Sequence, residues 1–349
     1  MKENIRVAVI GVGAFGRNHA RVYHQLQRSG EAVELAAIVD ADFARAQAVA
    51  KEFSSIAFRS TEELVGKIDA ASVAVPTSHH LQAARVLMEA GVDVLIEKPL
   101  AASIAEADEI AATAKRTGRV VQVGHLERFN PAVQATLPLL NQPMFFEVHR
   151  LSVFTPRSLD VDVILDLMIH DLDVVLSFVQ SQVREIRAVG LPVLSPRVDI
   201  ANVRLEFESG CVANFTASRV STERIRKLRF FQPHQYISID YARQDVITIQ
   251  VDEAAAMALM RGESPPAGSG PVTSINIQKP AVHPGEPLEA ELRAFLEAVR
   301  KRRKPLVSIE DGRATLALAL EINRAIAEHH ERANLESFNH KGHKGATKI

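Results

Sequence analysis

The first third of the chain alternates short apolar runs with longer amphipathic segments. Apolar runs rich in valine, isoleucine and alanine predict buried strands, and hydrophobic residues three or four positions apart predict helices. Strands that alternate with helices indicate βαβ units and a parallel sheet with right-handed crossovers. We therefore expect a doubly wound α/β domain of the Rossmann type over residues 1–125. Its predicted strands are 5–10, 33–39, 56–58, 70–75, 92–98 and 120–123, and its predicted helices are 17–28, 43–53, 61–66, 81–90 and 103–117.

The pattern changes after residue 125. Following a helical link to about residue 140, strand-like segments succeed one another through short connections, which indicates a mostly antiparallel sheet. Several segments alternate apolar and polar residues, so helices must cover one face of the sheet, while the other meets solvent or a partner. We expect an α+β domain for substrate binding and dimerisation over 126–330, a flexible loop at 261–271 and a disordered tail at 331–349. The predicted strands are 144–154, 183–191, 200–207, 211–218, 227–231, 236–240, 245–251 and 272–278, and the predicted helices are 162–176, 287–302 and 309–329.

Composition excludes several classes of protein. Of the 349 residues, 47% are hydrophobic and 24% are charged, which is ordinary for a globular protein. The formal net charge of −1 provides no overall basic surface for nucleic acid or an anionic membrane. The single cysteine, Cys211, has no partner for an internal disulfide, which favours a reducing compartment. No signal-peptide core or membrane-spanning apolar run is evident. We expect a cytoplasmic protein.

A glycine-rich motif, Gly11-Val12-Gly13-Ala14-Phe15-Gly16, follows the first predicted strand and opens a helix. In this context the first glycine permits a tight turn, the second admits a pyrophosphate, and the third allows close helix–strand packing. Asp40 ends the second strand, 24 residues after Gly16, where it can accept a ribose hydroxyl and repel a 2′-phosphate. The motif predicts NAD rather than NADP; the alternative is a glycine turn without a ligand. The cofactor-binding candidates here are Gly11, Gly13, Ala14, Phe15, Gly16 and Asp40.

Polar residues follow three further strands that should end at the same edge of the sheet. Ligands of open α/β sheets bind at this carboxyl edge. Proline cannot donate to a sheet, so the fifth strand ends at Lys98, before Pro99. The alternative to cofactor contact for an isolated Glu-Lys-Pro is a solvated strand end. The alternative for His79 is a solvated or helix-capping role. We expect five residues at this edge to contact the cofactor: Thr77, His80, Glu97, Lys98 and His125.

One predicted helix, 162–176, carries a polar stripe on an otherwise apolar surface. Asp166 and His170 are four residues apart, and Asp173 follows three residues later, so all three share one face of an α-helix. A helix that is apolar elsewhere is buried, and its acids then require a partner, an ion or a polar cavity. The alternatives are an internal Asp–His pair and a metal site. A nearby lysine disfavours the metal, and we expect none.

Together these residues resemble the Gfo/Idh/MocA family of oxidoreductases, over nearly the whole chain to about residue 330. The resemblance is carried by the glycine motif, by Glu97-Lys98-Pro99 and by Asp166-x-x-x-His170-x-x-Asp173. It implies an NAD-dependent dehydrogenase acting on a CH–OH group, with Lys98, Asp166 and His170 as the catalytic group.

Residues 124–131 and 165–171 are most similar to family members that oxidise the 3-hydroxyl of UDP-N-acetylglucosamine beside a PLP-dependent aminotransferase, toward a diamino sugar of lipid A. Residues 160–163, Asp-Val-Asp-Val, replace glycines found in many members, so substrates of better-known sugar dehydrogenases do not transfer. A diphosphate substrate requires cations, for which Arg219 and Arg224 are also candidates, although Arg224 is better explained as a surface charge. The expected substrate-binding residues are Lys98, Arg128, Asn130, Arg157, Asp166 and His170.

The implied mechanism assigns a role to each catalytic residue. His170 takes the hydroxyl proton, because histidine titrates near neutral pH. Asp166 orients the imidazole, and Lys98 stabilises the developing oxyanion; Lys98 and His170 could exchange these roles. Two other functions are possible: a dehydrogenase of a free sugar or inositol, and a non-catalytic regulator that binds NAD and a sugar. We expect a homodimer or homotetramer assembled through the antiparallel sheet.

Overall fold

The structure is a computed structural model that describes residues 4–155, 161–251, 261 and 275–333. The chain divides into two compact units. The first comprises Met1–Asn130 and Gly285–Ala317, and the second comprises Pro131–Pro284 and Leu318–Ile349. These units differ from the predicted domains, because the segment 285–317 returns to the first unit. The predicted domain limits remain predictions, since compactness does not test whether a segment folds independently.

The first unit is built on a six-stranded parallel sheet with the order β3-β2-β1-β4-β5-β6. This order is that of a dinucleotide-binding Rossmann sheet, so the predicted fold class is confirmed. The strands are β1 (Ile5–Ile10), β2 (Val33–Val39), β3 (Ile56–Phe58), β4 (Ala70–Val73), β5 (Asp93–Glu97) and β6 (Val121–Gly124).

Helices of the first unit fall close to their predicted positions. Ser103 Oγ accepts a hydrogen bond from the Glu106 amide and so caps the helix over residues 104–117. In the helix α8, Leu292 and Phe295 are buried in the core of the first unit. The helical elements are α1 (Ala14–Arg28), α2 (Phe43–Glu52), η1 (Glu62–Leu64), η2 (Thr77–His79), α3 (His80–Glu89), α4 (Ile104–Thr117), η3 (Leu126–Phe129), α8 (Pro287–Lys301) and the first part of α9 (Ile309–Arg332).

The second unit contains an eight-stranded sheet with the order β14-β13-β12-β11-β7-β10-β9-β8. Neighbouring strands are antiparallel except β7 and β10, which are parallel, so the predicted mostly antiparallel sheet is confirmed. Most of the predicted loop at 261–271 and residues 334–349 of the predicted tail lie outside the described residues. The strands are β7 (Phe145–Val153), β8 (Val183–Leu191), β9 (Ile200–Phe207), β10 (Val212–Ser221), β11 (Ile225–Gln232), β12 (Gln235–Asp240), β13 (Asp245–Val251) and β14 (Ile275–Gln278).

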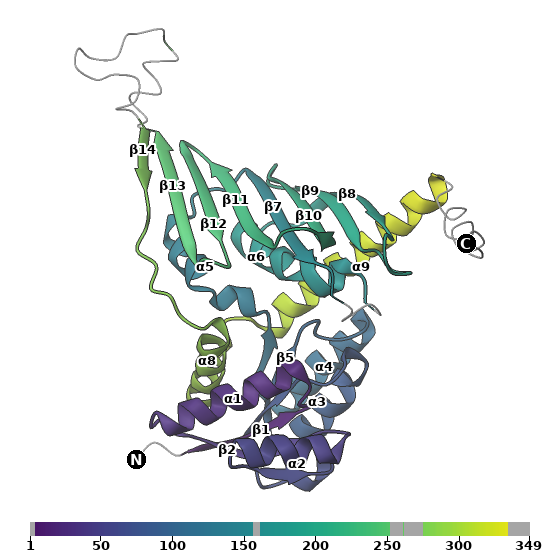
Figure 1. The fold of residues 1–349 in the computed structure, drawn as a ribbon, viewed down its shortest axis with the longest axis vertical. Coiled ribbons are helices and arrows are strands. Elements are labelled where there is room, and N and C mark those ends of the chain that lie inside the picture. Colours follow the sequence, from purple (N-terminus) through teal and green to yellow (C-terminus); the bar gives the residue numbers. More distant parts are fainter. Residues whose placement is uncertain (1–3, 156–160, 252–260, 262–274, 334–349) are drawn as a thin grey trace, which may run out of the picture. The chain divides into compact units, whose positions relative to one another are not determined.

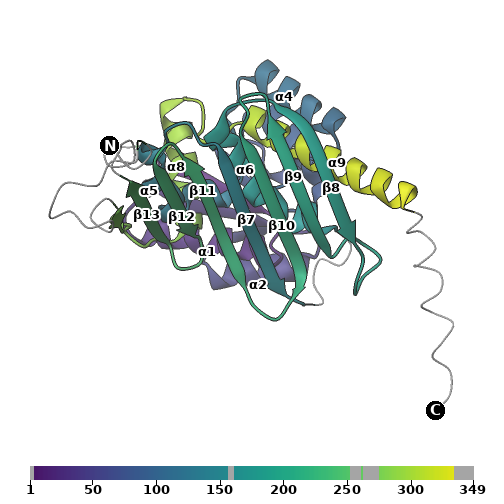
Figure 2. The same cartoon turned by 90° about the horizontal axis from the view of Figure 1, so that it is seen from above.

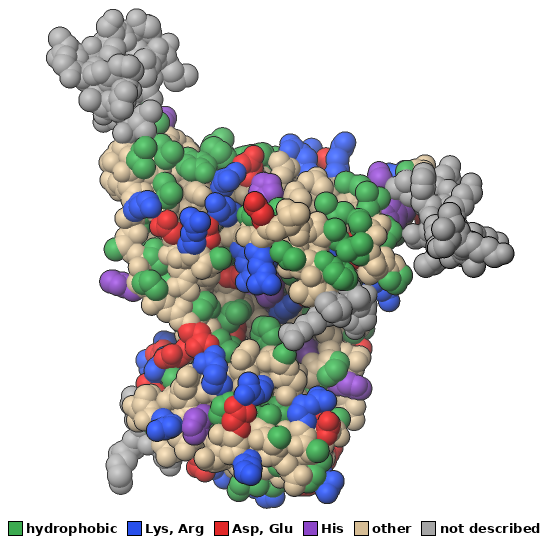
Figure 3. Space-filling model, viewed as in Figure 1, with side chains coloured by type: hydrophobic (Ala, Val, Ile, Leu, Met, Phe, Trp, Pro, Cys, Tyr) green, Lys and Arg blue, Asp and Glu red, His purple; other side chains and the backbone are tan. Residues whose placement is uncertain are grey.

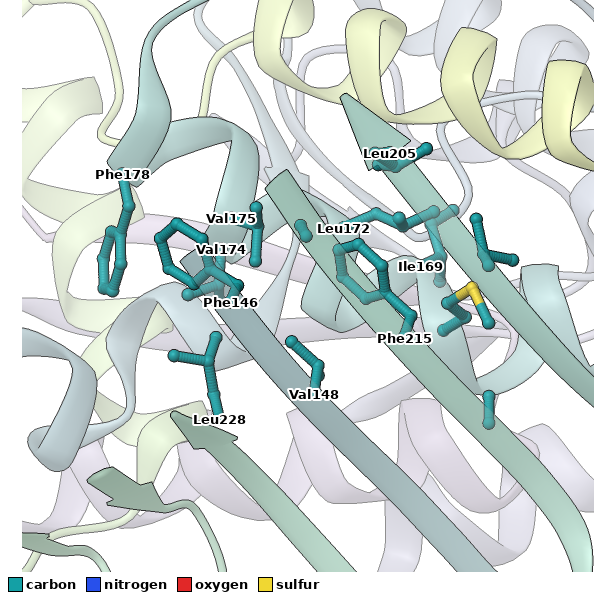
Figure 4. Close-up of a cluster of buried hydrophobic side chains, with 14 of the residues drawn as sticks. Phe146, Val148, Ile169, Leu172, Val174, Val175, Phe178, Leu205, Phe215 and Leu228 are labelled. Carbon is teal, nitrogen blue, oxygen red and sulfur yellow. The ribbon is translucent and has the colours of Figure 1, made fainter. Parts of the chain in front are cut away.

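Helices cover one face of this sheet, and the other face is open (Figures 1 and 2). The covering elements include α5 (Pro131–Thr136), η4 (Leu137–Leu139), α6 (Ile169–Val179) and the last part of α9. Phe146 stacks on Phe230 with ring centroids 5.3 Å apart, and Phe178 meets Phe230 at 5.9 Å. Figure 4 shows α6 contributing Ile169, Leu172 and Val175 to the same cluster. Burial of each such side chain contributes roughly 1.5–3 kcal/mol.

The described surface carries mixed charges, as the net charge of −1 indicates. Lysine and arginine side chains lie among acidic ones over the visible face of each unit (Figure 3). In the described part of the chain, no helix is both long enough and apolar enough to cross a membrane.

A buried ion pair joins α6 to the sheet beneath it. Arg150 on β7 donates from Nε to Asp171 Oδ2 at 2.6 Å and from Nη2 to Oδ1 at 2.9 Å. The two side chains are 5% and 2% exposed, and the guanidinium lies 5.2 Å from the centre of the Tyr241 ring. A bidentate pair of this kind fixes both the position and the orientation of α6.

Removal of one member of this pair should destabilise the protein. We expect Asp171→Leu to lower the free energy of unfolding by about 3–5 kcal/mol, because it leaves a buried arginine without its carboxylate. The double variant Arg150→Met/Asp171→Leu should recover much of this loss. Arg184→Met is the control, because Arg184 is 64% exposed and its pair with Glu206 is superficial; it should cost less than about 1 kcal/mol. Urea denaturation measures all three, and a double variant no more stable than the single one would contradict the prediction.

Candidate functional site

Glycine is required for a different structural reason at each of the three positions in the turn after β1. Gly11 has φ +84°, and a Cβ there would lie 2.8 Å from the Ala74 carbonyl oxygen. A Cβ on Gly16 would lie 1.8 Å from the Gly11 oxygen, so only glycine allows α1 to approach the turn this closely. A Cβ on Gly13 would meet no atom within 4 Å. The first and third glycines therefore serve packing, whereas the second leaves open space at the turn.

The N-terminus of α1 faces this open space. Gly13 is the N-cap of the helix and supplies no side-chain cap, and the first helical residues, Ala14 and Phe15, are exposed. The free amides of a first helical turn, together with the helix dipole, attract an anion. The turn thus fits the pyrophosphate of a dinucleotide.

Asp40 holds the glycine turn in place from the end of β2. Its Oδ2 accepts the Val12 amide at 2.8 Å, and its Oδ1 accepts the Asp42 amide at 2.9 Å. Each carboxylate oxygen retains a second lone pair, so the group can still accept a ribose hydroxyl. Arg45 Nη1 lies 3.5 Å from Oδ1 and offsets part of the carboxylate charge. Discrimination against NADP remains a prediction, and it depends on both side chains.

The carboxyl ends of β4 and β5 carry four of the predicted cofactor contacts. Thr77 is half-buried in η2, and Lys98 is half-buried directly after β5. Glu97 is buried, and its Oε2 accepts the Lys98 amide at 3.2 Å. His80 is also buried, with Nε2 3.0 Å from the Val75 carbonyl oxygen and Nδ1 3.0 Å from that of Pro99. His80 therefore lies between the two strand ends.

Two buried histidines at this edge, His80 and His125, have lowered pKa values. Burial lowers the pKa of His80, and the neighbouring carbonyls and the Glu97 charge oppose that effect. His125, after β6, is 1% exposed. Burial and then the charges of Lys98 and Arg128 lower its pKa to about 3. His125 is therefore neutral at physiological pH, and no described residue hydrogen-bonds either of its ring nitrogens.

The predicted substrate-binding residues of the first unit follow β6. Arg128 is half-buried in η3. Asn130 is 3% exposed, and its amide donates to Glu127 Oε2 at 3.0 Å. Arg157 lies outside the described residues. In the second unit, Arg224 is exposed in the turn between β10 and β11, as a surface charge would be.

The polar helix of the second unit does not begin as an α-helix. Ile164–Met168 forms a π-helical turn, η5, and α6 follows directly. The prediction of one regular α-helix was wrong here, and such turns are frequent at functional sites. Asp162 Oδ1 accepts the amides of Ile164 and Leu165, both at 2.9 Å. Its Oδ2 accepts Asn323 Nδ2 at 2.9 Å. Asp162 therefore caps the turn.

The three residues of the predicted polar stripe differ in exposure. Asp166 and His170 are half-buried, whereas Asp173 is 1% exposed. Arg219 on β10 lies with Nη2 3.8 Å from Asp166 Oδ2, and it donates to the Val161 carbonyl oxygen at 2.6 Å. Because Arg219 is 5% exposed, it supports Asp166 from within the unit.

A second carboxylate completes the surroundings of Arg219. Asp199 Oδ1 lies 3.9 Å from Arg219 Nε, and Asp199 Oδ2 accepts the amides of residues 193–195 at 2.6–2.8 Å. One buried guanidinium thus connects the π-helical turn to the loop before β9. Arg219 was a candidate for binding a diphosphate, and the structure gives it this ion-pair role.

The sequence missed His19 on α1. It is 0% exposed, and its Nε2 lies 2.9 Å from Glu97 Oε1. Among the described residues, the trio of potential metal ligands within 4.8 Å of one another is His19, Glu97 and Glu291, and it does not include the acids of the polar helix. The signal for His19 is its spacing from Gly16 and Tyr23, which places it on the buried face of α1.

Two family models match the chain. Residues 5–125 match the model described as "Oxidoreductase family, NAD-binding Rossmann fold", and residues 142–233 match that of the "GFO/IDH/MocA C-terminal domain".

Similar proteins include several dehydrogenases. UDP-N-acetylglucosamine 3-dehydrogenase of Acidithiobacillus ferrooxidans is 35% identical over 93% of this chain and 97% of its own. Its solved structure superposes with a TM-score of 0.82, at 34% identity over 93% and 98% of the two chains. scyllo-Inositol 2-dehydrogenase (NAD(+)) of Bacillus subtilis is 27% identical over 63% of this chain and 69% of its own. Aldose-aldose oxidoreductase of Caulobacter crescentus, at 20% identity, 94% and 98% coverage and a TM-score of 0.76, shares the fold.

Substitution of two of the glycines should separate packing from cofactor binding. Gly13→Ala meets no protein atom, so its free energy of unfolding should stay within about 1 kcal/mol of the wild type. Its Kd for NAD should nevertheless rise at least about tenfold, equivalent to about 1.4 kcal/mol. Gly16→Ala should instead lower the free energy of unfolding by about 1–3 kcal/mol, because the new methyl group clashes with the Gly11 carbonyl. Urea denaturation and calorimetric titration with NAD distinguish these effects, and unchanged NAD affinity in Gly13→Ala would contradict the assignment.

Proposed function

Because the chain belongs to the Gfo/Idh/MocA oxidoreductase family, we propose that it oxidises a sugar-nucleotide hydroxyl to a ketone with NAD. The substrate we assign is UDP-N-acetylglucosamine, oxidised at its 3-hydroxyl to a keto sugar for later transamination. The observation that carries this choice is the 35% identity with a UDP-N-acetylglucosamine 3-dehydrogenase over almost the full length of both chains. The inositol dehydrogenase resembles a smaller part of this chain.

The first unit supplies the residues for cofactor binding. The amides at the start of α1 hold the pyrophosphate, Gly13 leaves space for it, and Asp40 accepts a ribose hydroxyl. When bound, NAD supplies the hydride acceptor. Thr77, His80, Glu97, Lys98 and His125 belong to the strand ends beside the nicotinamide half of the cofactor.

The proposed acid–base residues are Lys98, Asp166 and His170. His170 accepts the proton of the substrate hydroxyl, and Asp166 stabilises the resulting imidazolium. Arg219 keeps Asp166 in place through their ion pair. Lys98 stabilises the oxygen as negative charge develops on it. Arg128, Asn130 and Arg157 are the residues we assign to the substrate diphosphate.

A panel of substrates tests the reaction. Purified protein with NAD should produce NADH with UDP-N-acetylglucosamine and not with free sugars or inositols. Lys98→Met and His170→Ala should each lower kcat about 10²–10⁴-fold, as removal of an acid–base group does, with NAD binding retained. His79→Ala is a matched control, because His79 is exposed and lies outside this group. NADH production with an inositol alone would establish the alternative enzyme, and NAD binding without turnover of any substrate would favour a non-catalytic regulator.

The open face of the second unit's sheet supports a homo-oligomer. Phe145, Phe231, Tyr236, Ile249 and Ile277 oppose one another in register across five adjacent strands. Phe231 is 40% exposed and Ile277 is 66% exposed. The row is a continuous apolar surface, which in soluble proteins commonly marks an interface. We assign it to contact with a second copy of the chain in a dimer or tetramer. We also propose that the enzyme is cytoplasmic and that it works beside a PLP-dependent aminotransferase in lipid A synthesis.

Substitution within this apolar row should weaken self-association. We expect Phe231→Glu to raise the dissociation constant at least about tenfold, because a buried charge at an interface core is unfavourable. Sedimentation velocity over a range of protein concentrations measures the effect. Ile56→Glu is the control, since Ile56 is an apolar residue of the first unit with 62% exposure. A monomeric wild-type protein would refute the interface.

A further inference from the structure

Two buried histidines lie on opposite sides of Lys98, where His19 contacts the side chain of Glu97 and His80 contacts the backbone carbonyl of Pro99. His19 belongs to α1 and is 0% exposed, and His80 belongs to α3 and is 1% exposed. His19 acts on the residue before Lys98, and His80 acts on the residue after it. Both contacts are internal to the first unit.

The contact on the first side passes through Glu97. His19 Nε2 lies 2.9 Å from Glu97 Oε1, while Glu97 Oε2 accepts the Lys98 amide at 3.2 Å. With its hydrogen on Nε2, the His19 ring donates to Oε1, and the carboxylate accepts a hydrogen bond on each oxygen. The two oxygens of Glu97 thus connect α1 to the backbone of Lys98.

The carboxylate of Glu97 has little freedom to move. Gly124 is its register partner on β6, and a Cβ there would lie 3.0 Å from the Glu97 carboxyl carbon and from Oε2. Glu291 of α8 is also buried and offers a carboxylate oxygen within 4.8 Å of the His19 and Glu97 ligand atoms. An enclosed site of this kind holds the carboxylate in one position, from which it orients the Lys98 amide.

The contact on the second side passes through His80. Its Nδ1 lies 3.0 Å from the Pro99 oxygen and its Nε2 lies 3.0 Å from the Val75 oxygen. Proline has no amide hydrogen. A side chain can therefore hydrogen-bond the backbone of Pro99 only at its carbonyl oxygen. A neutral imidazole carries one N–H, so it donates either from Nδ1 to Pro99 or from Nε2 to Val75. We place the hydrogen on Nδ1, because the Leu100 carbonyl oxygen also lies 3.4 Å from this nitrogen, and the two ring nitrogens then have different roles. Their contributions can therefore be separated by substitution.

We propose that His19 and His80 are positioning residues, which fix the backbone on both sides of Lys98 and thereby direct its amine. The effect on turnover rests on the proposed function, whereas the effect on the Lys98 amine does not. Loss of either contact should change the surroundings and reactivity of the amine while the NAD-binding turn stays intact.

The test uses amide side chains that replace one ring nitrogen at a time. The Gln amide nitrogen corresponds to Nε2 of histidine and the Asn amide nitrogen to Nδ1. His19→Gln and His80→Asn retain the contacts to Glu97 and Pro99, whereas His80→Gln retains only the contact to Val75. His19→Leu and His80→Leu remove the contacts altogether. His24→Leu on α1, where His24 lies 5.8 Å from the Phe53 ring, and His79→Leu beside His80 are matched controls.

The main readout does not require a substrate. Brief acetic anhydride labelling of the full-length protein, followed by mass spectrometry, reports the reactivity of Lys98 relative to the exposed Lys51 of α2 in the same molecule. Thermal unfolding and NAD titration show whether each variant folds. We expect both Leu variants and His80→Gln to change the Lys98/Lys51 ratio at least about threefold and to lower kcat about ten- to a hundredfold, the scale of a small misplacement. His19→Gln and the controls should stay within about threefold of the wild type on both measures, and His80→Asn should do so in the Lys98/Lys51 ratio.

The same experiment can overturn the proposal. An unchanged Lys98/Lys51 ratio in the folded Leu variants would mean that the histidines only fill space. If a Leu variant does not fold, the comparison of His80→Asn with His80→Gln decides, since both replace histidine by an amide. Rescue by His80→Gln but not His80→Asn, or equal behaviour of the two, would reject the role of Nδ1. Absence of turnover in the wild type would refute the proposed function and leave the labelling result valid.

Discussion

The carboxylate of Glu97 joins three elements of the first unit. Glu97 ends strand β5, and its carboxylate contacts His19 on α1 and accepts the amide of Lys98. α1 is also the helix whose first turn faces the open space at Gly13. The glycine turn and the lysine turn are therefore connected through one buried acid. A buried carboxylate is unfavourable unless its oxygens accept hydrogen bonds. Breaking either contact of Glu97 would therefore cost free energy, which stabilises the connection.

In the second unit, arginines are the partners of the carboxylates on the polar helix. Asp171 on α6 pairs with Arg150, and Asp166 on the π-helical turn lies beside Arg219. Both arginines come from strands beneath the helix, and both are almost completely buried. An apolar surface alone would allow α6 to slide or rotate, because dispersion contacts are not directional. The ion pairs are directional, and they determine which way Asp166 and its neighbours point.

The architecture followed from the sequence to a large extent, because it depends on periodicity. The runs at Ile5–Ile10 and Val33–Val39 match the observed strands, and the predicted parallel and mostly antiparallel sheets are both present. The return of α8 to the first unit could not be predicted, since its apolar face would suit any exposed core. The π-helical turn was also missed, because Asp166 and His170 have ordinary α-helical spacing. Its formation depends on tertiary contacts such as that of Asn323 with Asp162.

The acidic residues of the candidate site were predicted from the sequence, whereas their contacts with basic residues were not. Asp40, Glu97 and Asp166 were identified at strand or helix positions, whereas the roles of Arg45, His19 and Arg219 emerged with the structure.

The sequence nevertheless contains a signal for the buried bases. On β7 the inward positions are Phe146, Val148 and Arg150, and on β10 they include Phe215, Ala217 and Arg219. An arginine in an apolar register must find a carboxylate, just as an acid on an apolar helix must find a cation. Arg150 and Arg219 at these positions lie beside Asp171 and Asp166, which are acids of the predicted 162–176 helix. Basic residues at inward positions thus indicate which acids a fold holds in place.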